Sequence, residues 1–354
     1  MNIQPESLDF FKRILETPSP SGYEQPVQGL VREFASRFAD EVSTDVHGNV
    51  IAVRNPGAPL RVMLAGHADQ IGFLVHYIDS EGYLYVHPVG GWDPQIVVGQ
   101  RMTVWTQGGP VFGVIARKPI HLLTEDERKQ VVKLKDVWVD IGAKDQAQGS
   151  SLVRIGDPVT LELGFRNMLN ERASSPSMDD KTGLWVAMEA LRRTQGQELK
   201  CALYAVSTVQ EEIGLRGAKT SAFRIDPHVG IAVDVTHATD CPTVEKKVSG
   251  DVALDKGPVI FRGPNMNPRV ADRLIEAAIK AQIPYQLDAS GSATGTDANV
   301  MQINRAGVAA GLIGIPNRYM HSPVEMVSLS DLDHAAELLA QFALALTGAE
   351  DFTP

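Results

Sequence analysis

The sequence predicts an α/β protein with a mostly parallel central sheet flanked by helices, into which a small all-β domain is inserted. Helix and strand patterns alternate before about residue 70 and again after about residue 164, which is typical of a sheet covered on both faces. Between these positions only short strand-like stretches occur, separated by turn-forming residues. We therefore expect residues 1–69 and 164–354 to form one domain, and residues 70–163 to form a barrel-like insertion.

The N-terminal segment is expected to begin with two helices. Apolar residues recur on one helical face between Leu8 and Leu15, and "TPSPSG" follows as a stop signal. A second helix is expected over residues 24–39. The stretch "DVHGNVIAV" is typical of a hairpin, and the strand "RVMLAG" ends at His67.

The insertion and the C-terminal part differ in their pattern of predicted helices and strands. The insertion carries the strand-like stretches "GFLVHYI", "YLYVHPV", "MTVWT", "VFGVIA", "VWVDIG" and "PVTLEL", with no helix longer than two turns between them. After Asp180 helices are expected over residues 182–193, 267–281, 297–304 and 330–347. They alternate with the strands "CALYAVSTV", "HVGIAVDV", "PYQLD" and "GVAAGLIGI".

Composition excludes several classes of partner. The chain has 354 residues and a formal net charge of −10, which argues against nucleic acid or an anionic membrane as a partner. Glu6, Asp9 and Lys12 interrupt the N-terminal segment, so no signal peptide is expected. The longest apolar run is too short to span a bilayer. Cys201 and Cys241 give no disulfide framework, and we expect a cytoplasmic protein.

Polar side chains gather just after the predicted strands. They are His67 with Asp69, Asp179 with Asp180, Glu211 with Glu212, Asp234, and His321. In open α/β sheets ligands bind outside the carboxyl ends of the strands. Histidines combined with carboxylates suit a divalent cation of borderline softness, most typically zinc, with cobalt or manganese as other candidates.

Each cluster taken alone has a structural interpretation. His67 could be a hydrogen-bonded core histidine, and Asp179 with Asp180 could cap the helix that follows. Asp234 closes an apolar strand, which favours function, whereas His321 carries little weight alone.

The adjacent pair Glu211–Glu212 suggests two separate tasks. Successive residues at a strand end point in different directions. One carboxylate can therefore face a metal ion while its neighbour faces a reacting water molecule, as metal-assisted hydrolysis requires. Strand geometry does not decide which glutamate has which task, and a solvated acidic pair is the structural alternative.

Six motifs in this order resemble a known family: "AGHADQIGFLV", "SMDDKTG", "VQEEIGLRGA", "VDVTHATD", "ATGTDAN" and "RYMHSPVEM". Over essentially its whole length the chain resembles the tetrahedral dinuclear metallo-aminopeptidases, whose members are labelled glutamyl aminopeptidases or endoglucanases. The resemblance implies a zinc-exopeptidase-like catalytic domain that removes the N-terminal residue of short peptides. It also implies two divalent metal ions per subunit.

The resemblance implies a role for each metal-binding position. Asp179 would bridge the two ions. His67 and Asp234 would complete one site, and Glu212 and His321 the other.

The resemblance also separates catalytic residues from metal ligands. Glu211 would act as the general base, and Asp69 would orient His67. The peptide bond between Asp179 and Asp180 would be cis. In such enzymes the inserted domain takes part in dimer contacts, and dimers assemble into a hollow dodecamer.

Three alternatives remain at this stage. A deacylase or carboxypeptidase-like enzyme could use the same metals, but the long interval from Asp69 to Asp179 and the short one from Glu212 to Asp234 favour an aminopeptidase. A glycosidase needs two carboxylates opposed across a sugar, which adjacent glutamates cannot supply. A scaffold with a retained metal site is the non-enzymatic alternative. We expect a broad or neutral side-chain preference, because no basic cluster marks a pocket for acidic side chains.

Overall fold

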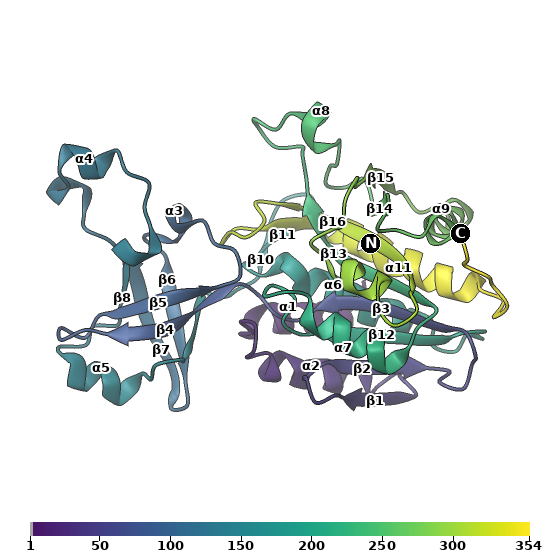
Figure 1. The fold of residues 1–354 in the computed structure, drawn as a ribbon, viewed down its shortest axis with the longest axis horizontal. Coiled ribbons are helices and arrows are strands. Elements are labelled where there is room, and N and C mark those ends of the chain that lie inside the picture. Colours follow the sequence, from purple (N-terminus) through teal and green to yellow (C-terminus); the bar gives the residue numbers. More distant parts are fainter. Residues whose placement is uncertain (1–2) are drawn as a thin grey trace.

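The computed structural model describes residues 3–354 and has two parts that lie side by side (Figure 1). The larger part contains an 11-stranded sheet covered by helices, and the smaller part is a closed β-barrel. This arrangement confirms the predicted fold class, an α/β domain with a separate all-β domain.

The large sheet is parallel at its centre and antiparallel at its margins. Its strand order is β1-β2-β12-β3-β13-β16-β17-β11-β10, and β14 pairs with both β15 and β16. The four central strands β12, β3, β13 and β16 run parallel, so their carboxyl ends meet at one edge. The strand bounds are β1 Glu41–Thr44, β2 Val50–Arg54, β3 Arg61–His67, β10 Arg166–Asn167, β11 Arg172–Ser174, β12 Ala202–Thr208, β13 Val229–His237, β14 Val259–Arg262, β15 Gln286–Ala289, β16 Ala309–Arg318 and β17 Met326–Ser328.

Helices cover both faces of this sheet. One face packs against α1, α2, α6, α9 and α11, and the other against α7 and α10. The helices of this part are α1 Pro5–Glu16, α2 Gln25–Ala35, α6 Met178–Arg193, α7 Arg216–Ile225, α8 Lys246–Ser249, α9 Pro268–Ala281, α10 Asp297–Gln302 and α11 Leu329–Ala345. Among the described residues no helix carries an apolar stretch long enough to cross a membrane.

Helix α7 was not expected from the sequence. Its buried residues are mostly small, namely Gly217, Ala218, Ser221 and Ala222, followed by Ile225. Small residues give a weak hydrophobic periodicity, but they allow the helix to approach the sheet closely. A Cβ atom on Gly217 would lie 2.4 Å from the backbone nitrogen of Val209.

The barrel closes in the order β4-β5-β8-β7-β6-β9, with β9 pairing back onto β4. Alternate side chains such as Phe73 and Val75 of β4 and Met102 and Val104 of β6 fill its interior. Its strands are β4 Gly72–Ile78, β5 Leu84–Val89, β6 Arg101–Thr106, β7 Gly109–Ala116, β8 Trp138–Asp140 and β9 Pro158–Leu161. Its helices are α3 Pro94–Val97, α4 Glu125–Arg128 and α5 Gln146–Leu152, with two short 3₁₀ turns at Ile120–Leu122 and Leu134–Asp136.

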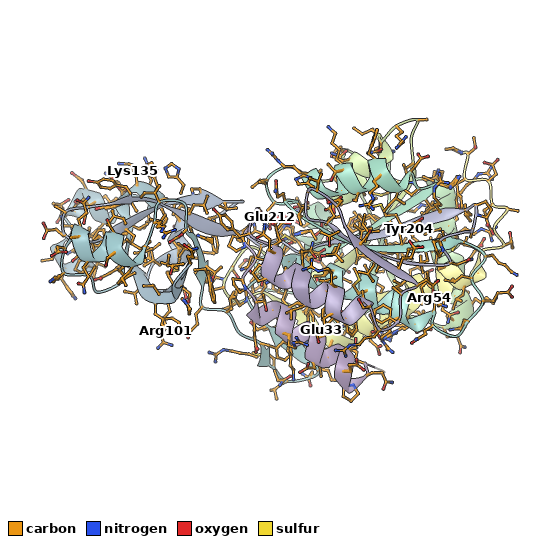
Figure 2. The ribbon with its side chains drawn as sticks, turned by 90° about the horizontal axis from the view of Figure 1, so that it is seen from below. Glu33, Arg54, Arg101, Lys135, Tyr204 and Glu212 are labelled. Carbon is orange, nitrogen blue, oxygen red and sulfur yellow. The ribbon has the colours of Figure 1, made fainter. Side chains whose placement is uncertain are left out.

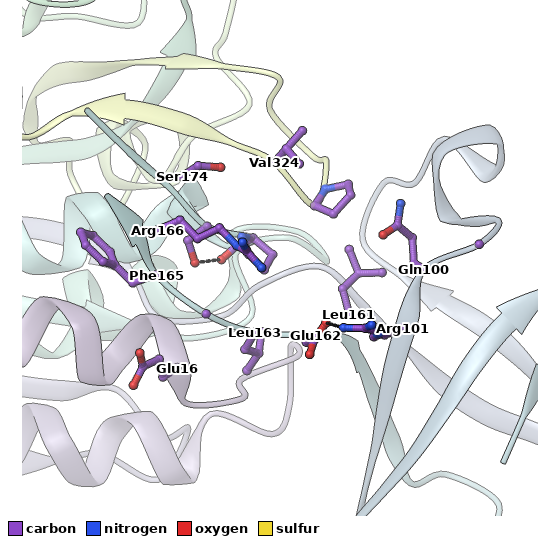
Figure 3. Close-up of a pocket in the computed structure, with 15 residues that line it drawn as sticks. Glu16, Gln100, Arg101, Leu161, Glu162, Leu163, Phe165, Arg166, Ser174 and Val324 are labelled. Atoms are coloured by element: carbon purple, nitrogen blue, oxygen red, sulfur yellow. Dashed lines mark hydrogen bonds and ion pairs between the residues drawn. The ribbon is translucent and has the colours of Figure 1, made fainter. Parts of the chain in front are cut away.

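A pocket of about 830 Å³ opens where the two parts meet (Figure 3). The connection that leaves the barrel, residues 161–166, lines it, and an ion pair between Arg101 and Glu162 lies beside it. The polar residues named above as metal-site candidates are not among the described residues that line this pocket. It therefore belongs to the junction between the two parts.

Candidate metal centre

The parallel centre of the sheet gathers the polar clusters. His67 is the last residue of β3 and lies opposite Thr208, the last residue of the neighbouring β12. Asp234 lies on β13, on the other side of β3. The carboxyl ends of three adjacent strands thus place imidazole and carboxylate groups at one edge of the sheet.

Helix α6 brings Asp179 to this edge because two glycines allow close packing. A Cβ atom on Gly66 of β3 would lie 2.2 Å from the backbone of Gly183 in α6. The peptide bond between Asp179 and Asp180 is cis, as the resemblance implied. Asp180 is fully buried, and its carboxylate accepts hydrogen bonds from the backbone N–H groups of His67 (3.2 Å) and Gly183 (2.9 Å).

The first group of candidate ligands surrounds His67. Its Nε2 atom lies 3.2 Å from Asp179 Oδ1, 3.8 Å from Glu211 Oε2 and 4.0 Å from Asp234 Oδ1. All four side chains are buried. His67, Glu211 and Asp234 offer ligand atoms close enough together to hold one ion.

The second group lies on the other side of Asp179. The Oδ2 atom of Asp179 is 3.1 Å from Nε2 of His321, and the same Nε2 atom is 3.4 Å from Oε1 of Glu212. Glu212 lies where the barrel meets the larger part (Figure 2). The barrel contributes to this group directly, because the carbonyl oxygen of Gly91 lies 2.9 Å from His321 Nδ1.

The surroundings of both histidines leave Nε2 free to bind a cation. Nδ1 of His67 lies 3.1 Å from the carbonyl oxygen of Asp69 and 3.4 Å from its carboxylate. Nδ1 of His321 faces the carbonyl of Gly91. A proton on each Nδ1 leaves the lone pair on Nε2, which is the arrangement found in metal-ligating histidines.

The centre carries an excess of negative charge. Burial and the neighbouring carboxylates, first Asp234, raise the pKa of Glu211 far above its ordinary value. The adjacent carboxylates, first Asp179 and then Glu212, raise the pKa of His321. For His67 burial acts in the opposite direction, but the Glu211 carboxylate and other nearby carboxylates outweigh it and raise the pKa. When no other cation balances the negative charge of the carboxylates, these glutamate and histidine side chains retain their protons.

These residues fit divalent cations. Two imidazole nitrogens and several carboxylate oxygens match the ligand preferences of zinc, cobalt and manganese. Oε1 of Glu212 is buried and has only a long contact, 3.4 Å, with Nε2 of His321 and no hydrogen bond of good geometry among the described residues, which is costly unless another partner binds it. A cation between Glu212, Asp179 and His321 would supply that partner and reduce the unbalanced charge.

Asp69 does more than face His67. Its Oδ1 accepts a hydrogen bond from the backbone N–H of Glu211 (3.0 Å), and its Oδ2 accepts one from that of Glu212 (3.2 Å). The hydroxyl of Ser21 also donates to Oδ2, at 2.6 Å. The carboxylate therefore fixes the backbone of both glutamates and also lies beside the Nδ1 edge of the imidazole.

Sequence reasoning did not identify two buried carboxylates beside the centre. Glu325 accepts hydrogen bonds from the backbone N–H groups of Asp179 (3.0 Å) and His321 (2.7 Å), so it ties two candidate ligands together. Asp297 accepts a hydrogen bond from the hydroxyl of Thr208 at 2.6 Å. Glu325 lies in the motif "RYMHSPVEM" and Asp297 in "ATGTDAN", and these motifs could have pointed to them. Neither residue follows a predicted strand, which is why the search of strand ends missed both.

An α/β sheet with histidines and several carboxylates at the carboxyl edge of its parallel strands is suited to metal-dependent hydrolysis. A family model described as M42 glutamyl aminopeptidase matches residues 48–338. The chain belongs to this family and is a metal-dependent aminopeptidase, so it cleaves peptide bonds.

Individual relatives agree with this placement. The lysyl aminopeptidase of Pyrococcus furiosus is 41% identical over 349 residues, covering 98% of this chain and 99% of the relative. A solved TET aminopeptidase from Thaumarchaeota archaeon SCGC AB-539-E09 is 38% identical, covers 96% of each chain and superposes with a TM-score of 0.92. The TET1 peptidase of Pyrococcus horikoshii is 30% identical with a TM-score of 0.86, covers 96% of this chain and 100% of that one, and can assemble into a tetrahedron or a large octahedral shell.

Proposed function

We propose that this aminopeptidase removes the N-terminal residue of short peptides with two divalent ions that share Asp179. The observation that carries the proposal is the position of the Asp179 carboxylate between two histidines from different elements. Its Oδ1 faces His67 and its Oδ2 faces His321, at 3.2 and 3.1 Å. A carboxylate with one histidine beside each oxygen is suited to bridge two cations.

His67 and Asp234 would hold one ion, and Glu212 and His321 the other. When bound, the ions would polarise the scissile carbonyl and make a water molecule more acidic. Zinc fits this donor set best, and cobalt or manganese fit it as well.

The family resemblance, and not the geometry, assigns Glu211 the role of general base, because His67, Glu211 and Asp234 lie close enough together to hold one ion. In this assignment Asp179 is shared, His67 and Asp234 bind one ion, and Glu212 and His321 bind the other. Glu211 can then accept a proton from the attacking water and pass it to the leaving amine. Its carboxylate is 3.8 Å from His67 Nε2, beside the proposed ions.

A pair of isosteric variants tests this division of roles. Glu211→Gln is expected to retain both ions and to lower kcat by at least ~10²-fold, the usual scale for a general base. Glu212→Gln is expected to lose one ion per subunit, measured by inductively coupled plasma mass spectrometry. The reverse pattern, with metal loss in Glu211→Gln only, would contradict the assignment.

We also propose that residues 70–163 form a dimerisation domain of an oligomer built from dimers, up to a dodecamer. The barrel exposes large apolar side chains, among them Phe112, Val114, Ile120 and Leu122, and such side chains commonly mark contact surfaces. The tetrahedral assembly of the Pyrococcus horikoshii relative supports the proposal that this chain forms a large oligomer. Native mass spectrometry tests it: twelve subunits are expected, and a stable monomer would exclude the proposal.

The side-chain preference is proposed to be broad or neutral. The relative from Pyrococcus furiosus is a lysyl aminopeptidase, whereas the family as a whole is described as glutamyl, so family membership leaves the preference of this chain open. A panel of acidic, basic and neutral aminoacyl p-nitroanilides measures it directly, and a single strongly preferred charge would overturn the expectation.

A further inference from the structure

The backbone that carries Glu211 and Glu212 is held by side chains and not by a neighbouring strand. Strand β12 ends at Thr208. The next four backbone N–H groups all donate to side-chain oxygens. They are Val209 to Asn49 Oδ1 (3.1 Å), Gln210 to Glu24 Oε1 (3.1 Å), Glu211 to Asp69 Oδ1 (3.0 Å) and Glu212 to Asp69 Oδ2 (3.2 Å).

Glu24 is the acceptor farthest from these residues in the sequence. It lies just before α2, 186 positions from Gln210, and is 3% exposed. Its Oε1 accepts two backbone hydrogen bonds, from Gly22 at 2.8 Å and from Gln210 at 3.1 Å. Both of these bonds use the same oxygen.

The loop that carries Glu24 also braces the end of β3. The hydroxyl of Ser19 donates to the carbonyl of Ala68 (2.7 Å), and that of Ser21 donates to Asp69 (2.6 Å). A β-bridge joins Pro20 to Gln70. Residues 19–24 therefore connect the segment after His67 to the segment of the two glutamates.

Gln210 requires such support because of its backbone conformation. Its φ angle is +56°, in the left-handed region that non-glycine residues adopt only with compensating contacts. The residue immediately precedes Glu211, so a change in its backbone would redirect the Glu211 side chain. Catalytic groups lose much of their effect when they are displaced by about 1 Å.

We propose that Glu24 is a positioning residue for the general base: it fixes the Gln210 backbone through Oε1 and thereby the direction of the Glu211 carboxylate. The proposal rests on the function assigned to Glu211 above. Because the hydrogen bonds from Gly22 and Gln210 both go to Oε1, the side chain must have the right length and one acceptor oxygen. Its negative charge is not required.

Three variants separate length from charge. Glu24→Gln keeps the length and the acceptor oxygen, so its kcat is expected to stay within about twofold of wild type. Glu24→Asp keeps the charge but is one methylene shorter, and Glu24→Ala removes the group. Both are expected to lower kcat about tenfold or more with unchanged KM and two ions per subunit, because at least one hydrogen bond is lost.

Hydrogen–deuterium exchange provides a readout that does not depend on activity. The peptide that contains Gln210 should exchange faster in the Asp and Ala variants and at the wild-type rate in the Gln variant. Glu350 offers a matched control, since its carboxylate also accepts backbone N–H groups, from Thr347 and Gly348, in the C-terminal loop. Glu350→Ala is expected to leave kcat unchanged.

Two kinetic results would overturn the proposal: a Gln variant as slow as the Asp variant, or an Asp variant with wild-type kcat. Loss of a metal ion together with the lower kcat would equally reject it, because the effect would then act on metal binding. If Glu24→Ala does not fold, the comparison of Asp with Gln decides. Failure of the proposed function looks different: the metal-loaded wild type would turn over no aminoacyl substrate.

Discussion

Replacement of Asp69 by Asn tests how far hydrogen bonding to the backbone supports catalysis. The carboxylate accepts from the N–H groups of Glu211 and Glu212 on different oxygens, and Ser21 donates to the second oxygen. An amide of the same shape has only one acceptor oxygen. Its NH₂ group must therefore face one of the two backbone N–H groups without accepting its hydrogen.

The magnitude follows from that single lost acceptor. A buried backbone N–H without a partner costs about 1–3 kcal/mol. If the resulting shift of the glutamate backbone raises the transition state by a further amount of this size relative to the bound ground state, kcat falls by about 5- to 150-fold, since 1.36 kcal/mol corresponds to a factor of ten. The free energy of unfolding should fall by a similar amount, because the same N–H is satisfied in the wild-type fold.

Asp331 provides the control for this variant. It is fully buried, and its two oxygens accept the backbone N–H groups of Asp255 (2.8 Å) and Gly257 (2.7 Å). Asp331→Asn should therefore lose about 1–3 kcal/mol in urea unfolding while its kcat stays at the wild-type value. Turnover of an aminoacyl p-nitroanilide and metal content are measured on both variants. Wild-type kcat in Asp69→Asn, or an equal loss of kcat in Asp331→Asn, would refute the reasoning.

Two further predictions concern packing and pH. Gly183→Ala should destabilise the fold by about 1–3 kcal/mol or more and reduce metal content. The added Cβ would lie 2.3 Å from Asp180 Oδ2 and 2.4 Å from the Val233 carbonyl, closer than the packing allows. An unchanged melting temperature would contradict this prediction. Glu189→Gln should lose about 1.5–3 kcal/mol at pH 7, since its buried carboxylate is bound by Arg192. Burial raises the pKa of Glu189, but the hydrogen bonds from Arg192 and Ser7 and the charges of Arg192 and Arg193 together outweigh it and lower the pKa below 4.5. The unfolded chain then binds more protons, so the wild-type advantage is present above about pH 4.5 and disappears as pH falls through the lowered pKa. Melting temperatures from pH 3 to 7 measure this, and a constant difference between the two proteins would refute it.

Much of the fold could be predicted because hydrophobic periodicity is local. The strand ending at His67 and the strand carrying Asp234 are short apolar runs with polar ends, and parallel strands bring such ends to one edge. Helix α7 was missed because its buried face consists of small residues. Its packing depends on how closely the sheet can be approached, which periodicity does not record.

The sequence by itself determined the types of side chain at the centre and their order along the chain. Only the tertiary structure decided which atoms meet. The Asp179 carboxylate lies between two histidines, the Gly91 carbonyl contacts Nδ1 of His321, and the Gln210 N–H donates to Glu24. The last two of these contacts join a backbone group to a side chain that is distant in sequence. Every residue except proline has the same backbone N–H and C=O groups, so residue type gives no sign of which partner they will find.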